Sequence, residues 1–124
     1  MTSEKKIQPK FEISWLSDNI IYCSYNDNVL INVTDIKDMI EIQEELGVDD
    51  KVKRIVHAGQ FTSITSEARN YIQKNKPKVK AEAFILTGLS QRILFNFYYK
   101  VRKNANPLKS FRNLNNAKKW IESI

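Results

Sequence analysis

The sequence predicts a single α/β domain in which a mainly parallel sheet packs against helices and is preceded by an antiparallel hairpin. Three observations lead to this fold class. The chain has 124 residues, which is enough for one domain with its own core. Two β-branched and aromatic segments lie close together near its start. Farther along, short apolar segments alternate with amphipathic stretches of helical period, as in parallel strands joined through helices.

The first two strands are expected at residues 11–16 and 20–25. Both segments are rich in β-branched and aromatic residues, and the Ser-Asp-Asn sequence between them is typical of a tight turn. The pair therefore predicts a β-hairpin. The short apolar segment 29–33 fits either a brief strand or the residues that lead into the next helix.

A first helix is expected to begin after Thr34, which has a typical N-cap side chain, and to end at Gly47. Helical spacing gives it an apolar face and an opposite acidic face. The apolar face consists of Ile36, Met39, Ile40, Gln43 and Leu46, and the acidic face of Asp38, Glu41, Glu44 and Glu45. We therefore expect this helix to cover the core and to show negative charge to solvent.

The second half of the chain continues the alternation. A strand at 53–58 is followed by the hydroxyl-rich start of a helix that runs to about Asn75. The nearly unbroken apolar segment 81–87 is typical of a central strand covered on both faces. A helix capped by Ser90 is expected to reach about Lys103, a short strand occupies 108–111, and a helix capped by Asn113 ends the chain.

Residues that could build a catalytic or metal centre are scarce. The three glycines, Gly47, Gly59 and Gly88, fall at the ends of expected elements, so no glycine-rich nucleotide loop can be assembled. The single histidine, His57, and the single cysteine, Cys23, cannot supply a structural zinc site. We therefore expect a protein that is not an enzyme, binds no metal and uses no cofactor.

Cellular location is predicted from the start of the chain and from its cysteine content. Residues 1–10 are polar and charged, and we expect them to form a flexible or extended segment of one domain spanning residues 1–124. They lack the apolar run of a secretory signal, and no later stretch is long enough to cross a bilayer. A lone cysteine in an apolar run fits a reducing interior. These features predict a cytoplasmic protein.

Charge is distributed unevenly along the chain. Residues 1–62 contain 7 Lys and Arg and 11 Asp and Glu, whereas residues 63–124 contain 13 and 3. A basic half favours an acidic partner such as nucleic acid, an anionic lipid surface or an acidic protein. The alternative is that the basic half simply faces the acidic half within one fold.

The first candidate site is the hydroxyl-rich segment before the second helix. Thr65 and Ser66 lie at the expected positive end of that helix, and Arg69 lies one turn farther on. These three residues are our candidates for a phosphate acceptor or an anion-binding site. The alternative is ordinary capping of the helix by one of the hydroxyls.

The second candidate site is the outer face of the helix expected at 90–103. At ~100° per residue, the buried stripe is expected to be Ile93, Leu94, Phe97, Tyr98 and Val101. The face turned away would then carry aromatic rings among cations, which is typical of a partner or dimer interface. Its candidates are Arg92, Phe95, Asn96, Tyr99, Arg102 and Lys103. Either another element covers these rings, or the acidic face of the first helix docks here in a homodimer.

Several segments of the second half resemble small bacterial SpoIIAA-like proteins, which are relatives of STAS domains. The matching segments, in order, are Ser66-Glu67-Ala68-Arg69-Asn70-Tyr71, Ala83-Phe84-Ile85-Leu86-Thr87-Gly88, Arg92-Ile93-Leu94-Phe95-Asn96-Phe97-Tyr98, Pro107-Leu108-Lys109-Ser110-Phe111 and Ala117-Lys118-Lys119-Trp120-Ile121. The resemblance runs from about Tyr22 to the C-terminus. It implies a mixed sheet of four to five strands with about four helices packed mainly on one face.

The resemblance also bears on function. In better-known STAS domains, a serine at the start of the helix after the third strand is phosphorylated, and Ser66 or Thr65 is its positional counterpart here. The Asp-Ser pattern of those domains is missing from residues 64–67. We expect a non-enzymatic protein-interaction or regulatory domain. The alternatives are a binder of a small anionic ligand, nucleotide or lipid at the C-terminal ends of the strands, and, third, nucleic-acid binding through the basic half.

Overall fold

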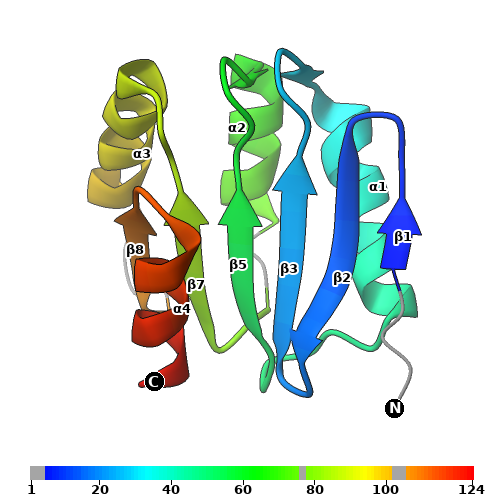
Figure 1. Ribbon diagram of the computed structural model, residues 1–124. Coiled ribbons are helices and arrows are strands. Elements are labelled where there is room, and N and C mark those ends of the chain that lie inside the picture. The colour runs from blue at the N-terminus through cyan, green and yellow to red at the C-terminus, as the bar shows by residue number, and fades with distance from the viewer. Residues whose placement is uncertain (1–4, 76–77, 102–105) are drawn as a thin grey trace.

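The computed structural model describes residues 5–75, 78–101 and 106–124, and for residues 97–101 it describes the backbone only. Six strands form one sheet in the order β1-β2-β3-β5-β7-β8 (Figure 1). The first three strands are antiparallel to one another, and β3, β5, β7 and β8 are parallel. The strands are β1 (Lys5–Ile7), β2 (Phe11–Ser17), β3 (Ile20–Tyr25), β5 (Lys53–His57), β7 (Ala81–Ile85) and β8 (Leu108–Phe111).

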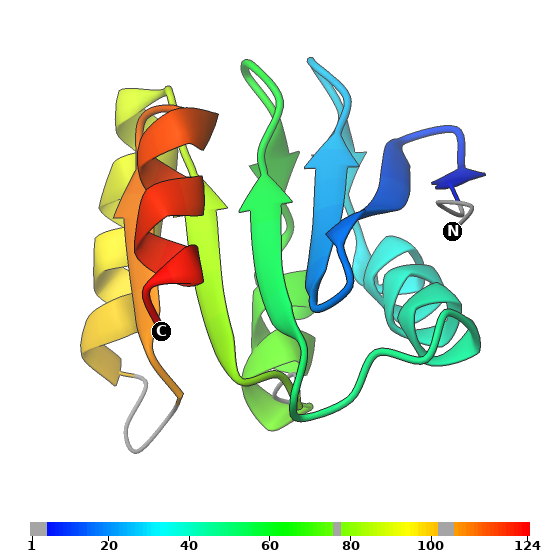
Figure 2. The same cartoon turned by 60° about the horizontal axis from the view of Figure 1, so that its bottom comes forward.

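Four helices cover the sheet unequally. The helices α1 (Val33–Glu45), α2 (Ser66–Lys74) and α3 (Leu89–Val101) lie on one face, and α4 (Leu114–Glu122) lies on the other (Figures 1 and 2). The helix α4 packs on β5, β7 and β8. Figure 2 shows no helix over the same side of β1, β2 and β3. The prediction of a mixed sheet with about four helices mainly on one face is confirmed.

A second, two-stranded parallel sheet lies at the C-terminal edge of the large one. It pairs β4 (Leu30–Ile31) with β6 (Ser63–Ile64). The loops before these strands are held together because the Asn28 amide donates to the carbonyl of Gln60 at 2.9 Å. A β-carbon on Gly59 would lie 2.3 Å from the carbonyl oxygen of Asn26, so this approach requires glycine.

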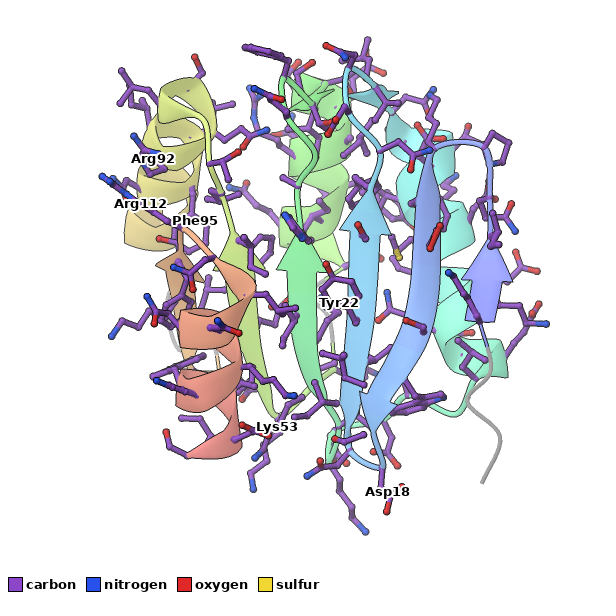
Figure 3. All side chains as sticks on the ribbon, in the orientation of Figure 1. Asp18, Tyr22, Lys53, Arg92, Phe95 and Arg112 are labelled. Carbon is purple, nitrogen blue, oxygen red and sulfur yellow. The ribbon has the colours of Figure 1, made fainter. Side chains whose placement is uncertain are left out.

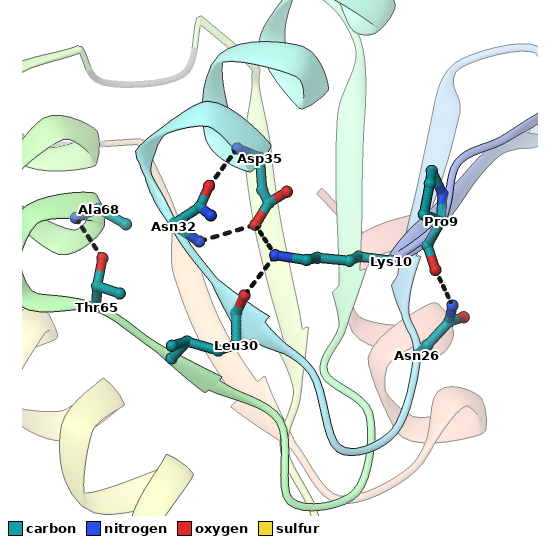
Figure 4. A network of polar contacts seen from close by, with 8 residues as sticks. All are labelled: Pro9, Lys10, Asn26, Leu30, Asn32, Asp35, Thr65 and Ala68. Atoms are coloured by element: carbon teal, nitrogen blue, oxygen red, sulfur yellow. Dashed lines mark hydrogen bonds and ion pairs between the residues drawn. The ribbon is translucent and has the colours of Figure 1, made fainter.

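The helix starts are fixed by side chains that satisfy free backbone amides (Figure 4). Asn32, and not Thr34, caps α1: its Oδ1 accepts from the Asp35 amide at 3.0 Å, and Asp35 Oδ2 accepts from the Asn32 amide at 2.9 Å. Lys10 Nζ forms an ion pair with the same carboxylate at 2.8 Å and donates to the carbonyl of Leu30. The Asp35 carboxylate thus takes part in the helix cap and also pairs with Lys10, which ties the segment before β2 to the start of α1.

Two layers of core separate the sheet from its helices. Between the sheet and α1 and α2 lie the alternate residues of β2 and β3, namely Phe11, Ile13, Ile21, Cys23 and Tyr25. Between the sheet and α4 lie Ile55, Ala81, Ala83 and Ile85 with Ala117 and Ile121. This alternation is the period of two that places neighbouring residues on opposite faces of a strand.

The strand boundaries follow the sequence prediction closely, with one addition. The hairpin, the strand at residues 53–57 and the strand at 81–85 lie where they are expected, and the ambiguous segment 29–33 supplies β4 before α1. The sheet has six strands, where four to five are predicted. The extra edge strand is β1, which pairs Lys5 with Ser14 and Ile7 with Glu12. Its sequence carries no strand signal, because it is short and its residues are exposed.

Candidate functional site

An internal cavity of about 210 Å³ lies between the sheet and the three helices on its larger covered face. Its wall is formed almost entirely by apolar atoms. The sheet contributes alternate residues of β5 and β7 such as Val56 and Phe84, and α1 contributes Met39. Ile72 of α2 and Leu94 of α3 complete the wall on the opposite side.

A buried charged pair lies in the wall of this cavity. Arg54 of β5 and Glu82 of β7 are direct neighbours in the parallel register, so both side chains project from the same face of the sheet. Arg54 Nε donates to Glu82 Oε2 at 3.1 Å, and Arg54 Nη2 forms an ion pair with the same oxygen. The positive charge is therefore balanced inside the protein.

Gln43 of α1 completes this cluster from the helix side. Its Oε1 accepts a hydrogen bond from Arg54 Nη1 at 2.7 Å. A guanidinium has donors only, so this contact fixes the amide with its oxygen toward Arg54 and its Nε2 elsewhere. Gln43 is 5% exposed and lines the cavity, and Nε2 has no acceptor among the described residues. The side chain of Gln43, which lines the cavity, thus carries one buried donor without a partner among the described residues.

Two further titratable groups in the wall, the Cys23 thiol and the Tyr25 hydroxyl, are kept neutral by burial. Burial raises the pKa of the Cys23 thiol to about 12, even though the Arg54 guanidinium lowers it. Burial also raises the pKa of the Tyr25 hydroxyl. For Arg54, burial has the largest single effect and lowers the pKa, but Glu82, Cys23 and Tyr25 together outweigh it, so the pKa is raised. At neutral pH the thiol and the phenol are uncharged and Arg54 is charged.

Gln91 of α3 lines the cavity at the end that lies near the C-terminal ends of the parallel strands. Its Nε2 donates to the carbonyls of Gly59 and Thr62 at 2.8 and 2.9 Å, which fastens α3 to the loop before β6. Of the lining residues, Ser63 of β6, Asn75 at the end of α2 and Leu94 of α3 are exposed. We therefore place the opening of the cavity beside α3, along the side formed by β6 and α2.

The predicted anion or phosphate site lies at the α2 edge of this cavity. Thr65 caps α2, because its Oγ1 accepts from the Ala68 amide at 3.1 Å (Figure 4). This is the capping role that the sequence left as the alternative. Ser66 is exposed at the first position of the helix. Arg69 lines the cavity, and its Nη1 donates to the carbonyl of Ile64 at 3.3 Å.

The predicted orientation of α3 is wrong at its N-terminal half. Phe95, expected on the outer face, is 9% exposed and packs on Phe84 with ring centroids 5.4 Å apart. Ile93, expected in the buried stripe, is 60% exposed. The side chains around this helix are apolar on several sides, so spacing alone does not select the buried face.

The remaining interface candidates have mixed positions. Asn96 is exposed, and Arg92 is half-buried with its Nη1 donating to the carbonyl of Thr87 at 2.9 Å. The side chain of Tyr99, and all of Arg102 and Lys103, lie outside the described residues. The exposed surface of α3 is instead apolar at its start, where Leu89 is 66% exposed and precedes Ile93 by one turn.

His57 lies on the opposite face of the sheet, where α4 packs. The Tyr22 hydroxyl and His57 Nδ1 form a hydrogen bond of 2.7 Å, and Tyr22 is visible at the centre of that face in Figure 3. Burial lowers the pKa of His57, and the nearby Asp27 carboxylate only partly opposes this. Among the described residues, no group of three or more His, Cys, Asp and Glu is placed to hold a metal ion.

The sequence prediction missed the cavity and its polar cluster. One signal was available: Glu82 is a carboxylate inside an otherwise apolar segment predicted to be a central strand. A buried carboxylate requires a cation nearby. The partner could have been sought in the neighbouring strand, which contains Lys53 and Arg54. Its register, and the approach of Gln43, come only from the fold.

Comparison with known proteins identifies a family and a solved structure that resemble this chain. The family described as "Domain of unknown function (DUF7793)" matches residues 14–124. A crystal structure of an uncharacterised protein of the DUF3478 family from Shewanella loihica PV-4, which has a SpoIIAA-like fold, superposes with a TM-score of 0.61. It is 13% identical and the match covers 98% of this chain and 96% of that one, so the SpoIIAA-like fold predicted from the sequence is confirmed. No curated protein matches the chain.

None of the helices described is long and apolar enough to cross a membrane.

Proposed function

The chain belongs to DUF7793, a family of domains of unknown function, and we propose that it is a non-enzymatic regulatory domain that binds a small, mainly apolar molecule. The observation that carries this proposal is the apolar cavity of about 210 Å³ between the sheet and α1, α2 and α3. Small-molecule sites are typically concave and apolar with a few polar groups that fix orientation. Here those groups are the cluster of Arg54, Glu82 and Gln43.

The size of the cavity sets the size of the ligand. An apolar cavity of about 150 Å³ can hold benzene. A somewhat larger cavity has room for a substituted aromatic ring or a short acyl chain. Such a ligand buries on the order of 200 Å² of apolar surface, which at about 25 cal/mol/Å² contributes about 5 kcal/mol. Association also costs translational and rotational freedom, so the affinity is weaker than the Kd of about 0.2 mM that this contribution alone would give, and binding should be sought at millimolar concentrations.

The chemistry of the wall supports binding over catalysis. The Cys23 thiol, with its pKa raised to about 12 by burial, is a poor nucleophile at neutral pH. Arg54 and Glu82 neutralise each other in an ion pair. A regulatory role is supported by the position of α3, which borders the cavity through Leu94 and carries exposed apolar side chains beside it. A cytoplasmic location is part of this proposal and fits the free, buried cysteine.

A matched pair of variants tests the proposal. Leu94 lines the opening, and Ile93 is its exposed neighbour that does not line the cavity. We expect Leu94→Trp to weaken binding of toluene at least tenfold, because the larger side chain obstructs the opening. Ile93→Trp should leave the affinity unchanged. Binding is measured from chemical shifts of cavity methyl groups. Failure of the wild-type protein to bind toluene at millimolar concentration contradicts the proposal.

A second candidate function is self-association through the start of α3, favoured by two exposed apolar side chains one turn apart. Leu89 and Ile93 are 66% and 60% exposed. We propose a second copy of the chain as the partner, because the exposed acidic side of α1 complements the basic second half of the sequence. Light scattering at low salt should show a dimer that Ile93→Asp or added salt dissociates. A monomer at every salt concentration refutes this candidate.

A further inference from the structure

The unused donor in the cavity wall defines what the ligand must carry. Gln43 Oε1 is committed to Arg54 Nη1, so Nε2 is the end of the amide that is left to donate. A buried donor without an acceptor destabilises the protein, and a ligand oxygen can recover that cost by accepting a hydrogen bond. The other amide in the wall, that of Gln91, already donates to two carbonyls.

The charge of the wall excludes a deeply buried ion as the best ligand. The positive charge of Arg54 is balanced by Glu82, so a ligand carboxylate placed beside the pair would add an uncompensated negative charge. A ligand ammonium would offer donors to a wall that itself presents a donor. The alternative is an anionic ligand held by Arg69, which lines the cavity on the α2 side.

We propose that the cavity binds a neutral, mainly apolar molecule whose single carbonyl, ether or hydroxyl oxygen accepts a hydrogen bond from Gln43 Nε2. This inference rests on the proposed function and adds the ligand's chemical class to it. The Arg54–Glu82 pair takes the role of a positioning group, because it holds the amide oxygen of Gln43 and thereby turns its nitrogen away from the pair. Specificity arises from that orientation, since an apolar wall alone would accept any molecule of suitable size.

Three probes of equal size separate the contributions of oxygen and charge. Cumene, acetophenone and benzoate each combine a benzene ring with a branched substituent of three non-hydrogen atoms. The substituent of cumene is apolar, that of acetophenone is neutral with one acceptor oxygen, and that of benzoate is anionic. Affinities are measured by NMR titration for the wild-type protein and for Gln43→Met, which removes the donor. We expect the variant to bind acetophenone about tenfold more weakly and cumene equally well or better. We also expect the wild-type Gln43 side-chain amide resonances to shift with acetophenone and not with cumene.

A second variant guards against misfolding of the first. Gln43→Leu also has no donor and adds no charge beside the Arg54–Glu82 pair, so it should weaken acetophenone binding in the same way. Each outcome separates the two levels of the argument. If neither cumene nor acetophenone binds, the proposed function fails. If both bind and removal of the donor leaves the acetophenone affinity unchanged, only the present inference fails. If benzoate binds more tightly than acetophenone and Arg69→Met abolishes this, the ligand is an anion and the inference is overturned.

Discussion

Removal of Glu82 alone should destabilise the protein more than removal of the whole charged pair. Glu82→Leu leaves the Arg54 guanidinium buried, with Gln43 as its hydrogen-bond acceptor and no carboxylate near it among the described residues. An uncompensated buried charge costs about 3–5 kcal/mol. Adding Arg54→Met to Glu82→Leu removes that charge and replaces it with an apolar side chain of similar length. The second substitution should therefore restore stability.

The size of the recovery follows from two opposing contributions. Removing the buried charge recovers about 3–5 kcal/mol, and the loss of the Arg54 to Gln43 hydrogen bond costs about 1–2 kcal/mol. The double variant should therefore be about 2 kcal/mol more stable than Glu82→Leu. With a urea m-value of about 1.5 kcal/mol/M, the unfolding midpoint rises by about 1.3 M.

The assay is equilibrium urea unfolding of the wild-type protein, both single variants and the double variant, followed by circular dichroism. Arg54→Met alone completes the cycle and gives the coupling energy of the pair. The reasoning is refuted if Glu82→Leu costs less than about 1 kcal/mol, or if the double variant is less stable than Glu82→Leu.

Three further predictions concern single positions. Thr65→Ala should cost about 1 kcal/mol of unfolding free energy through the lost cap of α2, while Ser66→Ala costs little; equal losses would contradict the assigned cap. Gly59→Ala should cost more than about 2 kcal/mol because its β-carbon meets the Asn26 carbonyl at 2.3 Å, whereas Gly88→Ala meets nothing nearer than 3.6 Å and serves as control. Burial lowers the pKa of His57 from its ordinary value of 6.5, so between the lowered pKa and 6.5 the unfolded chain binds more protons than the folded protein. Stability should therefore fall as the pH drops below 6.5. His57→Gln should flatten this slope, and an unchanged slope would assign it to other groups.

Strand positions could be predicted because each strand shows its own signal. The two arms of the hairpin are β-branched and aromatic, and the central strand β7 is an apolar run that is covered by helices on both faces. The predicted cap at Asn113 is confirmed, whereas the predicted cap at Ser90 is wrong because α3 begins at Leu89 and contains that residue. At the start of α1 two residues of capping type, Asn32 and Thr34, compete, and Asn32 also gains the reciprocal bond from Asp35.

The candidate site was harder to predict because it depends on distances between elements. The orientation of α3 could not be chosen from spacing, since Ile93, Leu94 and Phe95 are consecutive apolar residues and only contact with Phe84 selects Phe95. The polar cluster requires the register of β5 against β7. The cavity itself is a property of how closely three helices approach one sheet, and no residue type encodes it.

The central claim is that the space between the sheet and α1, α2 and α3 is a ligand site. The most direct test is the set of intermolecular nuclear Overhauser effects in a sample of the protein with millimolar cumene. We expect contacts from the ligand to the methyl groups of Ile72 and Leu94, which line the cavity from α2 and α3, respectively. Contacts only to the exposed Leu89 and Ile93, or no contacts at all, would contradict it.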